Sequence, residues 1–89
     1  MNRRQRTVAP RLARIIGPTL PLHAVEQLLD RGLLDLRACE RHIVADEIRR
    51  LETRGLPRCG AMHVVADELG CSYAKVRTLY YETFKQPKR

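Results

Sequence analysis

Two apolar patterns with helical spacing, separated by a single glycine, occupy residues 62–81 and constrain the fold more than any other stretch. Gly70 can adopt the positive φ that ends a helix and turns the chain sharply. Ser72 can cap the following helix by accepting a hydrogen bond from a backbone N–H of its first turn. The stretch therefore predicts two short helices joined by a tight turn. The side chains predicted to be buried are Val65, Ala66 and Leu69 in the first helix and Val76, Leu79 and Tyr80 in the second.

Three further helical patterns precede this stretch. They predict helices over residues 8–16, 21–31 and 36–54, with Thr19 as a cap for the second helix and Asp35 as a cap for the third. Long alternation of apolar and polar residues is missing, aromatic residues are few and tryptophan is absent. The sequence therefore predicts an all-α fold, a small bundle of about five helices that ends in a two-helix unit with helices at 61–69 and 73–85.

With 89 residues and no long linker, the chain is expected to form a single domain around one shared core. Residues 1–7 are polar and basic without helical periodicity, so they are predicted to be a flexible arm. Residues 8–55 are predicted to form a helical scaffold that also offers a surface for a dimer. The two-helix unit is assigned to residues 61–86.

The net charge of +7 is large for a chain of this size and is distributed unevenly. Residues 1–18 contain five arginines and no acidic residue, residues 19–57 are nearly balanced, and residues 58–89 contain six basic and three acidic residues. A polyanion is the natural partner of such a chain, because each phosphate neutralised by Lys or Arg releases a condensed counterion. Solubility and membrane-surface binding are the other uses of basic charge.

The three cysteines do not predict a disulfide scaffold, because their number is odd and no signal peptide precedes them. Two thiols and two imidazoles could in principle hold Zn²⁺ tetrahedrally. They are Cys39, His42, Cys59 and His63. Cys39, however, lies on an apolar helical stripe, where cysteine behaves as a small hydrophobic residue. We therefore expect free thiols, no metal and no cofactor.

The stretch 62–81 resembles the DNA-binding helix-turn-helix motif. The small Ala66, the turn residue Gly70 and the buried pair of Val76 and Leu79 stand at the spacing that this motif uses. The resemblance implies that helix 73–85 enters the major groove of double-stranded DNA, with its N-terminal residues and one exposed face near the base edges. It also implies sequence-specific binding, most simply by a small transcriptional regulator of the chromosome, a phage or another mobile element.

Helical spacing then indicates which side chains face outward. Tyr73, Arg77 and Tyr81 form one row, and Ala74 and Thr78 lie beside it. Arg77 is the best candidate for contacting a base, because guanidinium can bond guanine O6 and N7 together. By resemblance the positions that face DNA are Ser72, Tyr73, Ala74, Arg77, Thr78 and Tyr81, with Lys75, Arg58 and Lys85 as backbone contacts and His63 as a further donor.

Other functions remain open at this point. The same pattern occurs in helical hairpins that bind a partner protein, and the row of tyrosines could stack on unpaired RNA bases. An enzyme is not expected, because phosphate-binding loops, nucleophile motifs and paired-carboxylate signatures are missing. The remaining expectations are a homodimer, no small-molecule substrate, no membrane segment, and a cytoplasmic, nucleoid-associated location.

Overall fold

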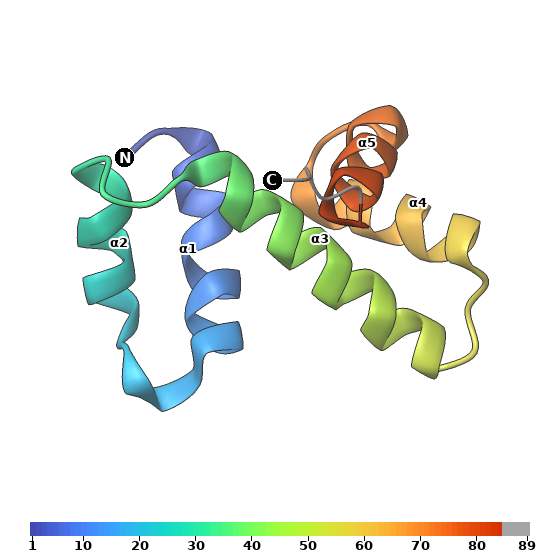
Figure 1. Cartoon of the computed structure of the whole chain (residues 1–89), viewed down its shortest axis with the longest axis horizontal. Helices are drawn as coiled ribbons and strands as arrows, with labels where there is room; N and C mark the ends of the chain where they lie inside the picture. The colour runs from blue at the N-terminus through green and yellow to red at the C-terminus, as the bar shows by residue number, and fades with distance from the viewer. Residues whose placement is uncertain (85–89) are drawn as a thin grey trace. The chain divides into compact units, whose positions relative to one another are not determined.

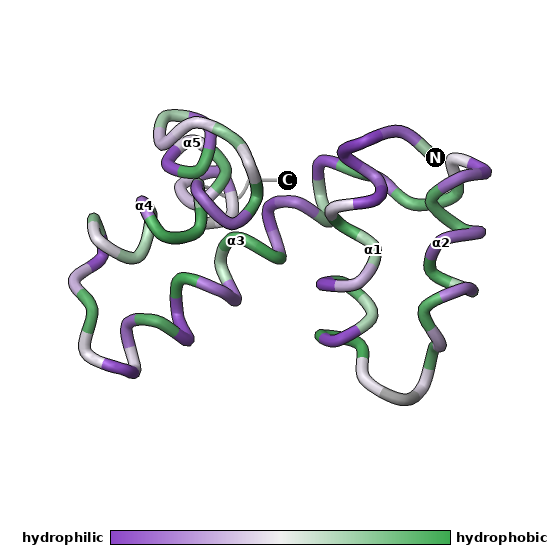
Figure 2. Tube along the Cα trace, turned by 180° about the vertical axis from the view of Figure 1, so that it is seen from behind, coloured by the Kyte–Doolittle hydropathy of each residue, from purple (hydrophilic) through white to green (hydrophobic). Residues whose placement is uncertain are grey.

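The computed structural model describes residues 1–84 of the chain. Within these residues it contains five α-helices, one short 3₁₀ turn and no strand (Figure 1). The prediction of an all-α fold is therefore confirmed. Hydrophobic and hydrophilic segments alternate along the helices (Figure 2). In the described part of the chain, no helix has the length and apolar character needed to cross a bilayer. The elements are α1 (Arg3–Ile16), η1 (Gly17–Thr19), α2 (Leu22–Asp30), α3 (Leu36–Thr53), α4 (Arg58–Leu69) and α5 (Tyr73–Phe84).

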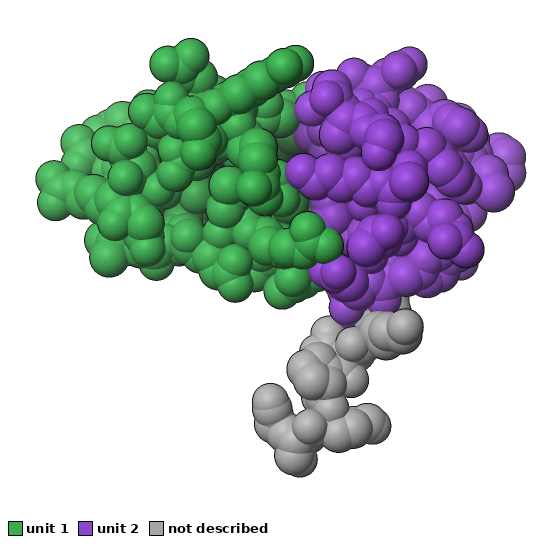
Figure 3. Space-filling model, turned by 90° about the horizontal axis from the view of Figure 1, so that it is seen from above, with its two compact units in different colours: residues 1–43 green, residues 44–89 purple. Residues whose placement is uncertain are grey.

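The chain divides into two compact units, residues 1–43 (unit 1) and residues 44–89 (unit 2) (Figure 3). Helix α3 contributes residues to both units. Each unit has its own cluster of buried hydrophobic side chains. The prediction of one core shared by all helices was therefore wrong. Periodicity along α3 marks its buried residues but not the helices that cover them. Ile43 belongs to the cluster of unit 1, whereas its neighbour Val44 belongs to that of unit 2.

In unit 1, α1 and α2 lie side by side and run in opposite directions (Figure 1). Their helix periodicity places apolar side chains between them, together with Ile43 from α3. The buried members of this cluster are Val8, Ala9, Leu12, Val25, Leu29 and Ile43.

Residues 1–7 are not a flexible arm, because α1 already begins at Arg3. A capping box starts the helix: Asn2 Oδ1 accepts from the backbone N–H of Gln5 at 2.8 Å, and Gln5 Oε1 accepts from that of Asn2 at 2.9 Å. The Gln5 side chain also donates to the backbone carbonyl of Leu29 at 2.8 Å. The prediction relied on polar composition and overlooked the capping-box pattern, in which Asn is followed by Gln three residues later.

Arg4 links the start of α1 to α3. Its Nε and Nη2 donate to the two carboxylate oxygens of Glu40 at 3.0 and 2.7 Å. Glu40 lies on α3, and only 8% of it is exposed. The carboxylate raises the pKa of Arg4 through this hydrogen bond and through its charge. A bidentate pair of this kind fixes geometry as well as charge, so α1 is tied to α3 within unit 1.

The predicted cap of α3 is confirmed, since Asp35 Oδ1 accepts from the N–H of Ala38 at 3.2 Å. Thr19 does not cap α2. Pro21 occupies that position without a side-chain hydrogen bond, and Thr19 lies in the 3₁₀ turn instead. A proline fits there because the first N–H groups of a helix have no partner inside the helix.

In unit 2, the second half of α3 packs with α4 and α5. The buried members of its cluster are Val44, Ile48, Ala61, Met62, Val65, Ala66, Val76, Leu79 and Tyr80. The helix predicted over 61–69 begins earlier, at Arg58. Pro57 and Gly60 are of residue types that commonly interrupt a helix. Instead Pro57 precedes the first turn, and its carbonyl accepts from the N–H of Ala61 at 2.9 Å. Gly60 lies inside that turn, where a glycine weakens the helix without ending it.

Candidate nucleic-acid interface

Gly70 forms the turn between α4 and α5, as predicted. Its φ of 68° and ψ of 36° are left-handed, a conformation that glycine adopts without steric cost. The N–H of Gly70 donates to the carbonyl of Asp67 at 3.2 Å, and the N–H of Cys71 donates to that of Ala66 at 3.0 Å. This pair of bonds is a Schellman motif, which satisfies the last carbonyls of α4 and fixes the exit direction of the chain.

Ser72 caps α5, again as predicted, because its Oγ accepts from the N–H of Lys75 at 3.1 Å. Val76, Leu79 and Tyr80 are buried against α4 and α3, as expected from their spacing. The axes of the two helices cross, since α4 extends across the view of Figure 1 while α5 points along the viewing direction. The turn, the cap and the buried stripe together determine which face of α5 is outward.

The outward face of α5 contains small, hydroxyl-bearing and basic side chains. No acidic residue occurs between Ser72 and Tyr81. Tyr81 is 45% exposed, so it belongs to this outward face. Of the predicted contact residues, Ser72, Ala74, Arg77, Thr78 and Tyr81 are exposed, while Tyr73 and Lys75 are intermediate.

Tyr73 is held from α4 by two contacts that the sequence did not reveal. Its ring stacks on that of His63, with centroids 4.2 Å apart and planes inclined by 20°. Its hydroxyl donates to Cys59 Sγ at 3.7 Å. This hydrogen bond is the main reason why the pKa of Tyr73 is raised. His63 and Cys59 are themselves exposed, so the three side chains form a continuous edge on the surface of unit 2.

Arg77 and Arg58 stand at the two ends of a pair of tyrosines. The Arg77 guanidinium carbon lies 5.5 Å from the centroid of the Tyr81 ring, and that of Arg58 lies 5.2 Å from the centroid of the Tyr80 ring. The two rings meet edge to face at 5.2 Å. These distances are within the range of cation–π and aromatic attraction. Tyr81 thus presents its ring to the residue predicted to contact a base.

Arg58 differs from Arg77 in having a carboxylate partner, because its Nε donates to Glu52 Oε2 at 2.8 Å. This hydrogen bond is the first cause of its raised pKa. A phosphate contact by Arg58 would have to share the guanidinium with Glu52. Lys85 lies outside the described residues.

In the sequence, Cys39 with His42 and Cys59 with His63 form two pairs at separations typical of metal ligands. In the described part of the chain, no three His, Cys, Asp or Glu side chains come together as a metal site. Cys59 Sγ instead accepts a hydrogen bond from Tyr73. Cys39 is half-buried, and burial is the main reason why its thiol pKa is raised, followed by the charges of Asp35 and Glu40.

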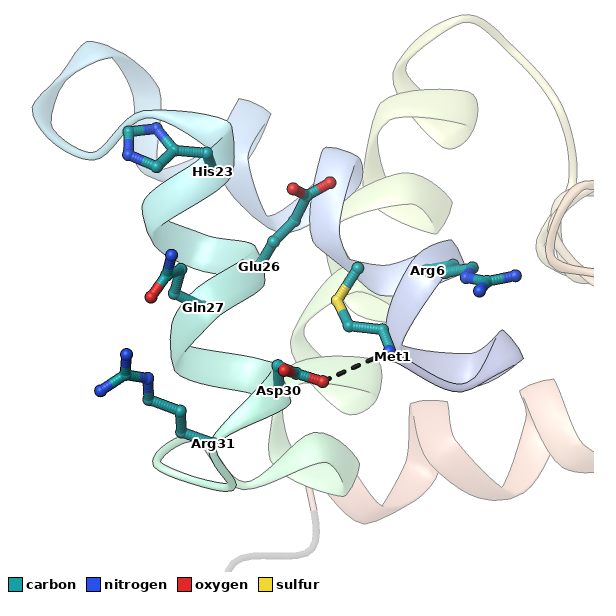
Figure 4. A pocket seen from close by; sticks show the side chains of 7 residues that line it. All are labelled: Met1, Arg6, His23, Glu26, Gln27, Asp30 and Arg31. Carbon is teal, nitrogen blue, oxygen red and sulfur yellow. Dashed lines mark ion pairs between the residues drawn. The ribbon is translucent and has the colours of Figure 1, made fainter.

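A surface pocket of about 500 Å³ lies in unit 1 and contains none of the predicted interface residues. The amino group of Met1 lies 3.3 Å from Asp30 Oδ1 in this pocket (Figure 4). The guanidinium of Arg6 points away from Glu26 and Asp30 in the same view. The pocket is lined by Met1, Arg6, His23, Glu26, Gln27, Asp30 and Arg31.

Comparison with protein-family models, curated proteins and solved structures finds no match for this chain.

Proposed function

We propose that this protein binds double-stranded DNA in a sequence-specific manner and inserts α5 into the major groove. The observation that carries the proposal is the outward face of α5, which is free of carboxylates from Ser72 to Tyr81 and begins directly after a fixed turn. A helix of this kind, crossing the preceding helix, matches the dimensions of the major groove.

Each exposed side chain then has a chemical role. Arg77 donates to guanine O6 and N7, and Ala74 and Thr78 are small enough to contact a thymine methyl group. Hydroxyl groups of Ser72 and Tyr81 donate to phosphate oxygens, which fixes the register of the helix on the duplex. Lys75 adds charge to the same contact zone.

Tyr73 supports duplex DNA over single-stranded RNA as the ligand. One face of its ring is occupied by His63, and its hydroxyl is occupied by Cys59. Only the opposite face of the ring is left for an unpaired base, whereas single-strand binding platforms stack successive bases on several aromatic side chains. A protein partner is less well supported than DNA, because no large aliphatic side chain is exposed among the side chains of α5 that the structure describes.

The wider proposal is a small transcriptional regulator, without catalytic activity, that acts as a homodimer on the cytoplasmic nucleoid. A single short helix contacts few base pairs, so two copies on a repeated or two-fold site would supply the missing specificity.

The decisive experiment selects duplexes from a random pool with the full chain and then measures affinity for the selected and scrambled sequences at several salt concentrations. Affinity should fall steeply between about 50 and 200 mM salt. Arg77→Ala should reduce the preference for the selected sequence by about 1–3 kcal/mol.

Arg54→Ala is the matched control, because Arg54 is an exposed arginine of unit 2 that lies outside α5. It should lower affinity for both duplexes equally and leave the preference unchanged. Equal affinity for all duplexes, or the same loss of preference in both variants, would exclude base contact by α5.

A further inference from the structure

We propose that one face of α2 is a docking groove for an acidic, amphipathic helix of another protein. Leu28 and Leu33 line this groove, together with Arg31. The inference goes beyond the proposed function, because the groove lies in unit 1 and uses no residue of α4 or α5. An uncovered apolar surface with charge of a single sign beside it carries the inference.

The two leucines of the groove have no place in either core. Leu28 is half-buried and Leu33 is 66% exposed, which makes Leu33 the most exposed large hydrophobic residue in the described part of the chain. Neither leucine is part of the two buried clusters or of the side chains that pack against them. Apolar side chains gain free energy when they leave water, so a partner that covers both leucines would gain affinity from them.

The turn at the end of α2 fixes the position of Leu33. Gly32 has a φ of 71°, and its N–H donates to the carbonyl of Leu29 at 3.1 Å, while the N–H of Leu33 donates to that of Leu28 at 2.9 Å. This pair of bonds is a Schellman motif, which commonly brings the side chains at the positions of Leu28 and Leu33 into contact. Such a contact still leaves most of Leu33 in solvent. Because the turn already orders this segment, little further ordering is needed when a partner binds.

The groove runs along one side of α2. Its volume is about 470 Å³, and its apolar lining continues from Leu28 and Leu33 to Ala24 and Leu20. Ala24 lies one helical turn before Leu28, and its small side chain leaves room for an aliphatic side chain of a partner. All lining residues come from α2 and the segments that flank it, so the groove is too shallow to enclose a small molecule. A helix with aliphatic residues at i, i+4 and i+7 fits it better.

The polar side chains of the groove give it positive charge only. Figure 4 shows His23, Gln27 and Arg31 on one side of α2. Glu26 and Asp30 lie on the other side in the same view, and no carboxylate occurs among the described residues that line the groove. Arg31 is exposed and forms no ion pair with another described residue. Its guanidinium is therefore open to a carboxylate of a partner.

A second copy of this chain matches the groove less well than an acidic partner does. In a two-fold contact the same surface lies on both sides, so the positive lining would face itself. Residues 1–43 contain eight arginines and only four acidic residues. An acidic partner is attracted by this charge and is held in register by the leucines.

The test titrates the full chain with dye-labelled synthetic peptides and measures fluorescence anisotropy. The first peptide is amphipathic, with leucines at i, i+4 and i+7 and glutamates on both sides of that stripe. The second peptide has lysines in place of the glutamates, and the third scrambles the first so that no stripe remains. The first peptide should bind with a micromolar Kd, and the other two should bind more weakly by about tenfold or more.

Two matched pairs of variants locate the binding. Leu33→Asn and Leu22→Asn both change an exposed leucine of unit 1, but only Leu33 lines the groove. Leu33→Asn should weaken binding of the first peptide by about tenfold, and Leu22→Asn should leave it unchanged. Arg31→Glu should reduce the preference for glutamates over lysines by about two- to fivefold. Arg54→Glu, at an exposed arginine of unit 2, should keep that preference.

The DNA affinity of Leu33→Asn should equal that of the unmodified protein, so the result does not depend on the proposed function. If Leu33→Asn loses helical circular dichroism, the comparison of Arg31→Glu with Arg54→Glu decides alone.

Equal weakening by Leu33→Asn and Leu22→Asn would overturn the proposal. Equal binding of the scrambled peptide would also overturn it, because net charge alone would then explain the affinity, and so would failure of the first peptide to bind at about 1 mM. A dimer in analytical ultracentrifugation that Leu33→Asn converts to a monomer would assign the groove to a second copy instead. Binding to phosphatidylserine vesicles that Leu33→Asn abolishes, without binding of the first peptide, would assign it to a membrane surface.

Discussion

At the scale of single residues, the arginines of this protein differ in what surrounds the guanidinium. Arg4 is held by the nearly buried carboxylate of Glu40, and Arg58 is held by Glu52. Arg77 lies over an aromatic ring instead. A carboxylate partner neutralises the guanidinium, whereas a ring leaves its edge and its charge open to a ligand. The surroundings of Arg77 therefore support its assignment to base contact more strongly than sequence position alone.

The ring of Tyr81 should orient Arg77. Tyr81→Leu removes the ring and should reduce the preference for a selected duplex by about 0.5–1 kcal/mol, the strength of a cation–π contact at an exposed site. Tyr81→Phe keeps the ring and should lose only the contribution of the hydroxyl to overall affinity. Fluorescence anisotropy with selected and scrambled duplexes measures both quantities. In an Arg77→Ala background, the effect of Tyr81→Leu on preference should vanish, and its persistence would mean that Tyr81 acts independently of Arg77.

Cys39 should make stability depend on alkaline pH. Its pKa is raised, chiefly by burial, so the folded protein favours the neutral thiol. A raised pKa contributes stability that is complete below the ordinary thiol value of about 8.5 and is lost as the pH rises through the raised value. Cys39→Ala should flatten the fall in thermal midpoint above about pH 8.5.

At the scale of elements, a helix end can be predicted from the sequence when it depends on one residue type at a fixed position relative to that end. Gly70 and Ser72 each satisfy a local requirement, so the turn before α5 could be predicted in detail. The start of α4 could not, because Pro57 and Gly60 resemble helix breakers until the position of the first turn is known. The contact of Tyr73 with Cys59 also escaped prediction. It joins residues 14 positions apart on crossing helices, and periodicity carries no information about such pairs.

Two glycines of unit 2 should respond oppositely to alanine. Gly70→Ala places a Cβ at a φ of 68° and should destabilise unit 2 by about 1–2 kcal/mol. Gly60→Ala occurs in a right-handed helical turn, where the new Cβ would lie 3.5 Å from Pro57 Cγ, an ordinary contact. It should stabilise the protein by roughly 0.4–1 kcal/mol. Urea unfolding measures both changes, and a stable Gly70→Ala variant would show that the left-handed turn is dispensable.

At the scale of the whole molecule, the two cores belong to units of 43 and 46 residues. The expectation of one shared core failed because composition reports how much apolar surface exists and does not report how that surface is divided. Leu29 and Val65 are fully buried in the separate clusters. Each unit is close to the size below which a hydrophobic core becomes marginal, and we therefore expect each core to depend closely on its own large side chains.

Leu29→Ala and Val65→Ala should each weaken one unit. Loss of a buried Leu costs about 2–5 kcal/mol through lost burial and the cavity that remains, and the smaller Val should cost less. Amide hydrogen exchange should accelerate mainly in α1 and α2 for the first variant and mainly in α4 and α5 for the second. Uniform acceleration over the whole chain in both variants would show that the two cores unfold as one.

The concentration of tyrosines on α5 has an optical consequence. Tyr73, Tyr80 and Tyr81 are the only tyrosines in a chain without tryptophan, so the intrinsic ultraviolet emission of the unmodified protein originates from one helix. That emission follows the state of unit 2 alone, whereas far-ultraviolet circular dichroism averages over all helices of both units. A denaturation curve recorded with both signals would reveal, from a single unlabelled sample, whether the two units melt together. Quenching of the same emission on addition of a duplex would report contact at α5 without any attached dye.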